Sequence, residues 1–555
     1  MEKKINRSIS LVAVLGFLVA TLVSQVPDRE KAVAGAERAF EKAAKAVTMP
    51  APGCAVGVSV DGKSVFEKAF GMAEMEHGIP NTAETIFESG SVAKQFTAAA
   101  LVMLSLEGKL SIDDPVRKYI PELPDYGKPL TIRHILNHTS GLRDWGSVMG
   151  VTGVGRGDRV VSQELALDVI FHQKALDFEP GAEYSYSNSG YQLATEIVER
   201  VSKQKFPDFV AERIFKPLGM THSSWRDDYQ RLVPGRAQAY SRDGNGPWKL
   251  DMPFMNVYGN GGMLTTVGDW LKWNAALDAK TFGEPFVRAL ETQGILNDGR
   301  KINYALGLSV ETASDGMKDI THGGSTAGYQ TFLARFPDKK LSVAVLCNGT
   351  GNNPGGLAYG VFEEIFGPPA EQAKVEPVSV TQDMLKKYVG LWRHEKKHMP
   401  LTTVVDKGNL RVAGGGVLRL LRDGLFQLGN GAVRWKFETG AGGKVIAFAA
   451  NNEGEINRYI AETGWTPTAA VLNSFAGEWY SEEAGATFKF VVDGGKAFFV
   501  QRPTTRLPLR PQYKDHFTVE GVGGVMWFER NNSGKITKLH IGASRMRDMP
   551  FVRVK

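Results

Sequence analysis

The chain has 555 residues, of which 43% are hydrophobic and 23% are charged, as in globular proteins with ample material for more than one core. Its formal net charge is only +6, and Lys and Arg are scattered among Asp and Glu. A nucleic-acid-binding protein would carry a basic face, so nucleic acid is not an expected partner. The length favours about three or four domains.

The first 24 residues are expected to be an export signal. Lys3, Lys4 and Arg7 precede a largely apolar run over residues 8–23, which has the order of a signal peptide and is short for a membrane span. Cleavage after Ser24 and cleavage after Ala34 both remain open. The sequence therefore predicts an exported protein, periplasmic or secreted. Its only expected membrane contact is an uncleaved signal, which would anchor it to the inner membrane.

Residues 30–367 alternate strand-like and helix-like segments. Residues 54–60 and 64–66 predict a hairpin around Asp61-Gly62, and residues 329–336 and 341–346 predict a second one. Between them, residues 91–107 predict a helix that is apolar nearly all round and therefore buried. Strands at both ends with helices between them indicate an α+β domain whose terminal strands share one sheet.

The C-terminal third has a different pattern. Residues 368–380 form a Pro- and Glu-bearing linker, after which short alternating strands continue to the end of the chain. Residues 388–392 (YVGLW) match residues 475–479 (FAGEW), so this part contains an internal repeat. We expect two small all-β barrels, lipocalin-like, at residues 381–465 and 472–555, each with about eight strands and its own core.

The chemistry is expected at Ser91-Val-Ala-Lys94. A spacing of three places both side chains on one helix face. A serine hydroxyl needs a neighbouring base to become a nucleophile, and a lysine buried among apolar residues loses its charge and can be that base. The same pattern recurs at Ser202 and Lys205, but in a charged segment that is expected to be solvated. We therefore predict Ser91 as nucleophile and Lys94 as base.

Four segments, taken in order, resemble a known family. They are residues 87–98 (FESGSVAKQFTA), 130–142 (LTIRHILNHTSGL), 180–190 (PGAEYSYSNSG) and 322–324 (HGG). Together they resemble serine β-lactamases, penicillin-binding DD-peptidases and the related D-aminopeptidases and esterases, over about residues 35–366. The resemblance implies a β-lactamase/transpeptidase-like domain. The layout with two barrels is similar to that of the family's D-aminopeptidases, in which a barrel loop can overhang the active site.

The resemblance also implies roles for individual residues. Tyr186 and Asn188 match its Y-x-N element: the tyrosine would relay a proton, with a pKa lowered from about 10 by a cationic lysine. The asparagine would orient Lys94 and the substrate. Tyr258-Gly-Asn260 is a competing Y-x-N, whose tyrosine we expect near the cleft rim.

His322-Gly-Gly324 stands where β-lactamases have Lys-Thr-Gly. His322 would relay protons or bind a substrate carboxylate. Gly324 would let substrate approach closely, and the Ser325 and Ser91 N–H groups would form an oxyanion hole. A histidine in place of the family's lysine favours the peptidase and esterase branches over β-lactamases.

Three further features have competing interpretations. If the resemblance holds, Cys54 and Cys347 lie on neighbouring strands, so a disulfide and two buried thiols are both open. His134 and His138 have the spacing of a metal pair but are expected to be structural, since no third ligand is evident. His394 and His398 satisfy H-E-x-x-H, but Pro400 and the β context predict a hairpin loop, not a zinc site.

The expected function is that of a serine hydrolase without metal or organic cofactor, working through an acyl-enzyme on a small-molecule or peptide substrate. Peptides or amides containing D-amino acids are the favoured substrates, as for a D-aminopeptidase or DD-carboxypeptidase. A carboxylesterase using the same residues is the alternative. A catalytically inactive binding protein that uses its barrels is a further one. The sequence predicts no oligomeric state.

Overall fold

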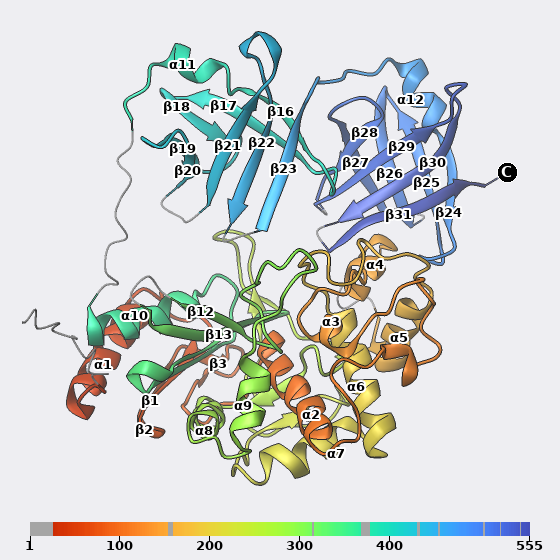
Figure 1. Cartoon of the computed structure of the whole chain (residues 1–555). Coiled ribbons are helices and arrows are strands. Elements are labelled where there is room, and N and C mark those ends of the chain that lie inside the picture. Colours follow the sequence, from red (N-terminus) through yellow and green to blue (C-terminus); the bar gives the residue numbers. More distant parts are fainter. Residues whose placement is uncertain are drawn as a thin grey trace, which may run out of the picture.

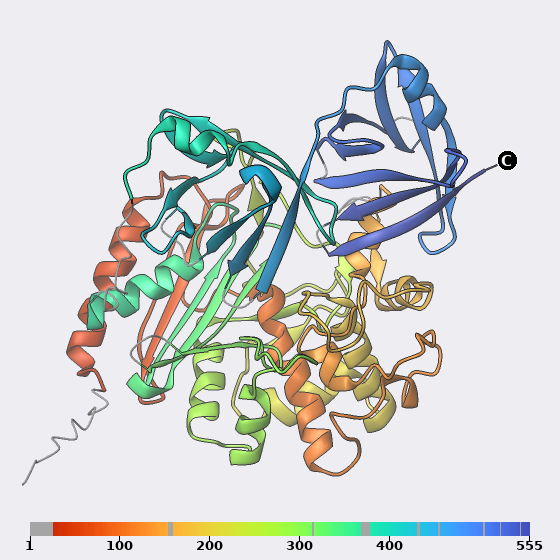
Figure 2. The same ribbon diagram turned by 45° about the horizontal axis from the view of Figure 1, so that its top comes forward.

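The computed structural model describes residues 26–554 except 154–158, 313–315, 368–377, 430–432, 453–454, 503–504, 522 and 544. The expected export signal and most of the expected linker lie outside these residues. Figures 1 and 2 show a mixed α/β part with two barrels side by side on one side of it. The predicted α+β domain followed by two β-barrels is therefore confirmed.

A six-stranded antiparallel sheet is the centre of the first part. In spatial order its strands are β12 (Ser309–Thr312), β13 (Lys318–Thr326), β14 (Tyr329–Phe336), β15 (Leu341–Cys347), β1 (Cys54–Val60) and β2 (Lys63–Phe70). Both predicted hairpins are present, and the first and last long strands pair as expected. Cys54 lies directly opposite Cys347, and their sulfur atoms are joined in a disulfide.

Helices cover both faces of this sheet (Figures 1 and 2). On one face, α1 (Arg29–Lys45) and α10 (Pro354–Phe366) pack with alternate residues of β1 and β15, such as Val56 and Val345. On the other face, α8 (Val267–Asp278) contacts the same two strands. Strand periodicity thus divides the apolar residues between two cores, because successive side chains point to opposite faces.

The remaining helices form a second layer around α2 (Lys94–Leu106). They are α3 (Ile132–Leu136), α4 (Trp145–Val151), α5 (Gln163–Phe171), α6 (Ser189–Ser202), α7 (Phe206–Val210) and α9 (Glu284–Glu291). Short strand pairs connect them: β3 (Met72–Glu74) with β4 (Ile79–Pro80), β6 (Val161–Ser162) with β10 (Met255–Asn256), β8 (Tyr240–Ser241) with β9 (Lys249–Leu250), and β11 (Met263–Thr265) between β5 (Phe87–Glu88) and β7 (Ser224–Trp225). Every residue of α2 from Lys94 to Leu104 is buried, as its all-round apolar pattern predicts.

One detail differs from the expected helix over residues 91–107. Ser91 lies in a 3-10 turn, η1 (Gly90–Ala93), and the α-helix begins only at Lys94. The turn presses closely against β13, since a Cβ at Gly90 would lie 2.5 Å from the Ser325 nitrogen. In 3-10 geometry, side chains three residues apart eclipse each other, so the tighter turn brings Ser91 over Lys94.

The two barrels repeat one plan, and each closes with eight strands. The first comprises β16 (Gly390–His394), β17 (Pro400–Asp406), β18 (Asn409–Val412), β19 (Val417–Leu420), β20 (Phe426–Leu428), β21 (Arg434–Thr439), β22 (Val445–Asn452) and β23 (Glu455–Glu462). The second comprises β24 (Gly477–Ser481), β25 (Ala486–Asp493), β26 (Lys496–Arg502), β27 (Thr505–Pro511), β28 (His516–Val519), β29 (Gly524–Arg530), β30 (Ile536–Ala543) and β31 (Met546–Arg553).

The repeated sequence has a repeated structural role in the barrels. A short helix, α11 (Gln382–Lys386) or α12 (Ala469–Phe475), precedes each barrel. The repeated tryptophans, Trp392 and Trp479, lie on the first strand of each barrel and fill its core. Among the described residues no helix has the length and apolarity needed to cross a membrane.

The second barrel docks onto the α4–α5 region of the mixed α/β part through buried contacts. Val148 and Val151 of α4 join the apolar core of the barrel. Arg143 forms an ion pair with Glu483 of the barrel at 2.5 Å, and both side chains are less than a tenth exposed. The second barrel is therefore joined to the rest of the molecule by a buried interface.

Candidate active site

Ser91 lines a cavity of about 790 Å³, and Lys94 lies buried next to it. The Lys94 Nζ lies 3.2 Å from the Ser91 Oγ, and the lysine is completely buried while the serine remains partly accessible. Burial lowers the pKa of Lys94 well below 10.5; the positive charge of Arg545 lowers it further, and Asp144 opposes the shift. Burial therefore favours the neutral amine of Lys94 over its charged form.

The other hydrogen bonds of Lys94 orient its lone pair. Its Nζ donates to the Asn188 Oδ1 at 2.9 Å and to the Asn260 carbonyl at 2.5 Å. A neutral amine has two N–H groups and one lone pair, and these two acceptors use both N–H groups. When Lys94 is neutral, its lone pair is left for the hydroxyl proton of Ser91. The surroundings of Lys94 therefore prepare it to accept that proton.

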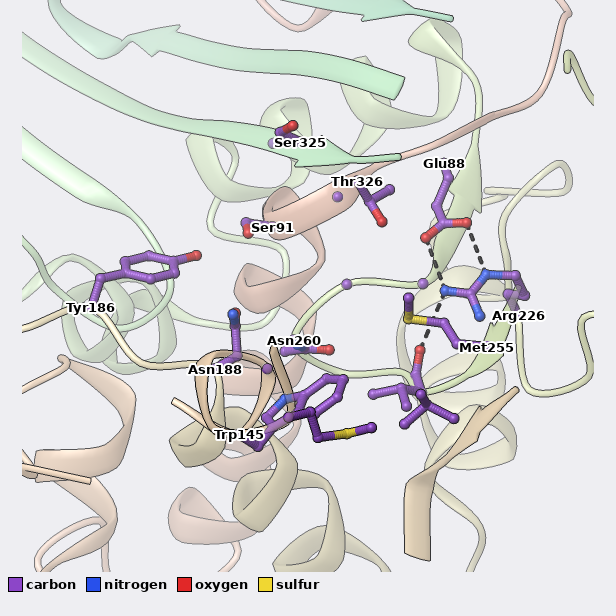
Figure 3. A pocket seen from close by; sticks show the side chains of 18 of the residues that line it. Glu88, Ser91, Trp145, Tyr186, Asn188, Arg226, Met255, Asn260, Ser325 and Thr326 are labelled. Carbon is purple, nitrogen blue, oxygen red and sulfur yellow. Dashed lines mark hydrogen bonds and ion pairs between the residues drawn. The ribbon is translucent and has the colours of Figure 1, made fainter. Parts of the chain in front are cut away.

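Asn188 is itself fixed by Asp144. The Asn188 Nδ2 and backbone N–H both donate to the Asp144 Oδ2, at 2.9 and 2.8 Å. The other Asp144 oxygen caps α4 by accepting from the Ser147 N–H. Because the amide nitrogen of Asn188 is held by a carboxylate, its oxygen must face Lys94. In Figure 3 the Asn188 side chain points toward the space beside Ser91.

Tyr186 lies on the other side of the nucleophile, and its hydroxyl end points toward Ser91 (Figure 3). Its ring centre is 5.0 Å from the Lys94 Nζ. The expected lowering of its pKa is wrong: burial raises the pKa of Tyr186 above 10, and this outweighs the nearby Ser91 hydroxyl and the charge of Arg545, which lower it. Tyr186 stays a neutral phenol, suited to pass a proton on and not to act as a phenolate base.

Replacing Tyr186 by phenylalanine is expected to lower kcat about 100-fold, because a positioned proton donor contributes at least that much. Labelling of Ser91 by a fluorophosphonate should slow less, because fluoride leaves without a proton. A kcat within threefold of the wild-type value on an amide substrate would contradict the relay. Tyr258→Phe, in the competing Y-x-N, is the matched control.

His322 lines the cavity but has different contacts from those expected of a relay or a carboxylate receptor. Its Nδ1 lies 2.6 Å from the Gly323 carbonyl, which can only accept, so this nitrogen carries the proton. Its Nε2 then accepts from the Tyr304 hydroxyl at 2.8 Å. Burial, together with Lys94, lowers the pKa of His322 to about 3. A neutral imidazole with both nitrogens engaged supports the position of Tyr304 and β13.

Gly324 and Ser325 lie on β13 beside the nucleophile turn. A Cβ at Gly324 would lie 2.1 Å from the Ser89 carbonyl oxygen, so no larger residue fits against this turn. Ser91 and Ser325 both line the cavity, and Figure 3 shows them on neighbouring elements, η1 and β13. Their backbone N–H groups are the expected oxyanion hole, and the close approach of β13 to η1 is compatible with it.

The structure separates the other sequence candidates from this site. Lys205 is exposed, so the second Ser-x-x-Lys pattern is solvated as expected. Tyr258 does not line the cavity: it stacks on Phe206 and its hydroxyl donates to Glu199. From the competing Y-x-N, only Asn260 reaches the site, through its backbone carbonyl.

The histidine pairs have structural contacts. His134 completes a capping box at the start of α3, and the His138 Nδ1 accepts from the Ser187 N–H. The His394 Nδ1 accepts from the Lys396 and Lys397 N–H groups, while His398 stacks on Trp527. The H-E-x-x-H segment is therefore a hairpin turn after β16, as predicted.

Four residues that contribute to the site were not identified from the sequence. Asp144 lies two residues beyond the recognised segment 130–142, so extending that segment would have found it. The Asn260 carbonyl carries no side-chain signal. Tyr304 and Arg545 lie outside every motif, and Arg545 is more than 400 residues from Ser91 in the sequence. Only the folded arrangement brings Tyr304 to His322 and Arg545 to the cavity.

A serine at a cavity wall beside a buried lysine, on this α+β scaffold, defines a serine hydrolase. The Beta-lactamase family model matches residues 40–361, so the chain belongs to that family. A penicillin-binding protein of Bacillus subtilis is 27% identical over 64% of this chain and 82% of its own length. A D-aminopeptidase of Cereibacter sphaeroides is 29% identical over 54% of this chain, a match that spans only 57% of that enzyme.

Solved structures show the same fold. The octameric penicillin-binding protein homologue from Pyrococcus abyssi superposes with a TM-score of 0.55 at 23% identity, covering 85% of this chain and 98% of that one. A D-stereospecific amidohydrolase from Streptomyces sp. gives a TM-score of 0.51 at 23% identity, covering 60% of this chain and 98% of its own.

Proposed function

We propose that this chain is a peptidase or amidase that hydrolyses peptides or amides containing D-amino acids through an acyl-enzyme on Ser91. The observation that carries the mechanism is the position of the Lys94 Nζ, 3.2 Å from the Ser91 Oγ and with both N–H groups used elsewhere. Relatives named D-aminopeptidase support the substrate class. A histidine at position 322, where β-lactamases have a lysine, favours amides over β-lactams.

Acylation would start with transfer of the Ser91 hydroxyl proton to Lys94. The Ser91 Oγ forms a bond to the substrate carbonyl carbon, and the Ser91 and Ser325 N–H groups stabilise the negative oxygen. The carbon–nitrogen bond then breaks, and the amine leaves with the proton returned from Lys94 through Tyr186. An ester now joins the acyl part to Ser91, and the Lys94 amine is neutral again.

Deacylation reverses the roles with water in place of the amine. Lys94 takes a proton from water, the hydroxide oxygen bonds to the acyl carbon, and the bond to the Ser91 Oγ breaks. The proton returns to Ser91, and a carboxylic acid is released. One base therefore serves both halves of the reaction.

Stereochemistry and bond type can be tested together on the purified protein. D-alanine p-nitroanilide is expected to be hydrolysed at least 100-fold faster, in kcat/KM, than its L isomer, and Ser91→Ala should abolish the activity. Ser202→Ala, in the other Ser-x-x-Lys pattern, should match the wild type. Turnover confined to short-chain esters would replace the proposal by an esterase. No Ser91-dependent turnover at all would favour a binding protein.

We further propose that the protein works outside the cytoplasm. The charged and apolar N-terminal segment supports export. The Cys54–Cys347 disulfide supports an oxidising compartment, because cytosolic thiols are kept reduced.

A further inference from the structure

The charges around the cavity are unevenly distributed. Among the described residues that line it, Glu88 is the only one with a carboxylate, whereas three carry guanidinium groups: Arg159, Arg226 and Arg545. Lys94 is buried behind the nucleophile and is not among these lining residues. This excess of positive groups matters because a charged group of a substrate binds best beside a group of the opposite charge.

Glu88 is not available to a substrate. It is completely buried, and its two oxygens accept from the Arg226 Nε and Nη2 at 2.8 and 3.0 Å (Figure 3). Arg236 adds a third contact at 3.3 Å. Asp144, behind Asn188, is likewise occupied and does not line the cavity. The described lining therefore offers no free carboxylate to a substrate ammonium group.

Unlike Glu88, Arg545 is exposed at the cavity. It lies between β30 and β31 of the second barrel, and its backbone carbonyl accepts from the Asp144 N–H at 3.0 Å. Its guanidinium lies 4.7 Å from the ring centre of Tyr186. The side chain is nevertheless exposed, and among the described residues it makes no ion pair. Arg545 is thus a cation anchored by its backbone at the cavity, and no described residue accepts a hydrogen bond from its guanidinium.

The contact with Tyr186 indicates which part of a substrate Arg545 would meet. Tyr186 is the residue proposed to hand a proton to the departing amine, so the leaving group must lie against its hydroxyl. Arg545 covers the ring of the same tyrosine. A carboxylate a few bonds beyond the leaving nitrogen would therefore come within reach of the guanidinium, which binds carboxylates in a bidentate, charge-assisted manner.

We propose that Arg545 is a specificity-determining residue that binds a carboxylate on the leaving-group side of the substrate. This rests on the proposed function of Ser91. It makes the active site composite, because the second barrel supplies a substrate-binding group from outside the residues matched by the Beta-lactamase family model. It also distinguishes substrates: a free carboxylate after the scissile bond is favoured over a neutral or cationic group there.

A matched pair of substrates isolates this charge. N-acetyl-D-alanyl-D-alanine and its C-terminal amide differ only in the leaving-group carboxylate. The wild type is expected to prefer the acid about 10- to 100-fold in kcat/KM, mainly through KM, as one charge-assisted contact provides. Arg545→Met should reduce the preference to about one, because it weakens the acid far more than the amide. Arg545→Lys should retain part of it, and Arg545→Glu should favour the amide.

Controls separate this role from a structural one. Arg506→Met, at an exposed arginine of the same barrel, should leave the preference unchanged. An equal loss on acid and amide in Arg545→Met would show a merely positioning role and overturn the proposal. Loss of the preference in Arg159→Met but not in Arg545→Met would also overturn it, as would a wild type that does not distinguish the two dipeptides or cleaves neither.

A failure of the proposed function of Ser91 can be told apart from a failure of the Arg545 assignment. If D-alanine p-nitroanilide is cleaved in a Ser91-dependent manner while Arg545 has no charge-selective effect, only the specificity assignment falls. If no substrate is cleaved in that manner, the proposed function falls and takes the assignment with it.

Discussion

Lys94→Met is expected to lower kcat/KM about 1,000- to 10,000-fold, because it removes the group that takes the Ser91 proton. Methionine has a similar volume and carries no charge, so it fits the apolar surroundings of α2. It leaves the Asn188 Oδ1 and the Asn260 carbonyl without a donor but also removes the cost of burying an amine. The melting temperature should therefore stay within about 4 °C of the wild type.

The same variant tests the protonation state of Lys94. The folded pKa lies well below 10.5, the value of an unperturbed lysine. Between these two pKa values the unfolded chain binds one more proton than the folded one, so unfolding free energy rises with pH across this window. Lys94→Met should lose that rise. Lys205→Met, at the exposed lysine of the other pattern, should keep both the rise and full activity. A Lys94→Met variant with more than a tenth of wild-type activity would contradict its role as base.

Arg143→Met is expected to cost about 3–5 kcal/mol of stability, because it leaves buried acidic groups without their partner. Glu483 of the second barrel loses an ion pair at 2.5 Å, and Asp177 loses one at 3.6 Å. The second barrel, which carries Arg545, is then held less firmly against α4. Calorimetry should show a lower melting temperature, and kcat/KM should fall although Arg143 does not line the cavity.

An exposed ion pair of the same barrel provides the control. Lys489 and Glu478 are paired at 2.7 Å but both remain about half exposed. Lys489→Met is expected to change the unfolding free energy by less than about 1 kcal/mol, as is usual for surface pairs. Equal effects of the two substitutions would show that the buried pair does not hold the barrel in place.

Much of the fold could be predicted because local patterns carry it. The hairpin of β1 and β2 follows from strand alternation and Asp61-Gly62, both of which have positive φ angles. The all-round apolar run of α2 predicts its burial, and the repeated YVGLW and FAGEW segments predict two barrels. The 3-10 turn at Ser91 could not be foreseen, since the approach of β13 that accompanies it involves residues more than 200 positions away.

The site was predictable to the extent that its residues belong to motifs. Ser91, Lys94, Tyr186 and Asn188 meet as the resemblance implies. The pKa of Tyr186 was predicted in the wrong direction, because sequence shows the neighbouring lysine but not the burial of both residues. The contacts of His322 depend on Tyr304. The positive charge near Tyr186 comes from Arg545, which lies in the turn between β30 and β31. Both are long-range consequences of packing.

Mass spectrometry of the protein after exposure to a fluorophosphonate probe tests the central claim most directly. The account predicts one covalent adduct, mapped to the peptide containing Ser91, absent in Ser91→Ala and formed at least 100 times more slowly in Lys94→Met. An adduct on another residue, or labelling of Ser91 at an unchanged rate without Lys94, would contradict it.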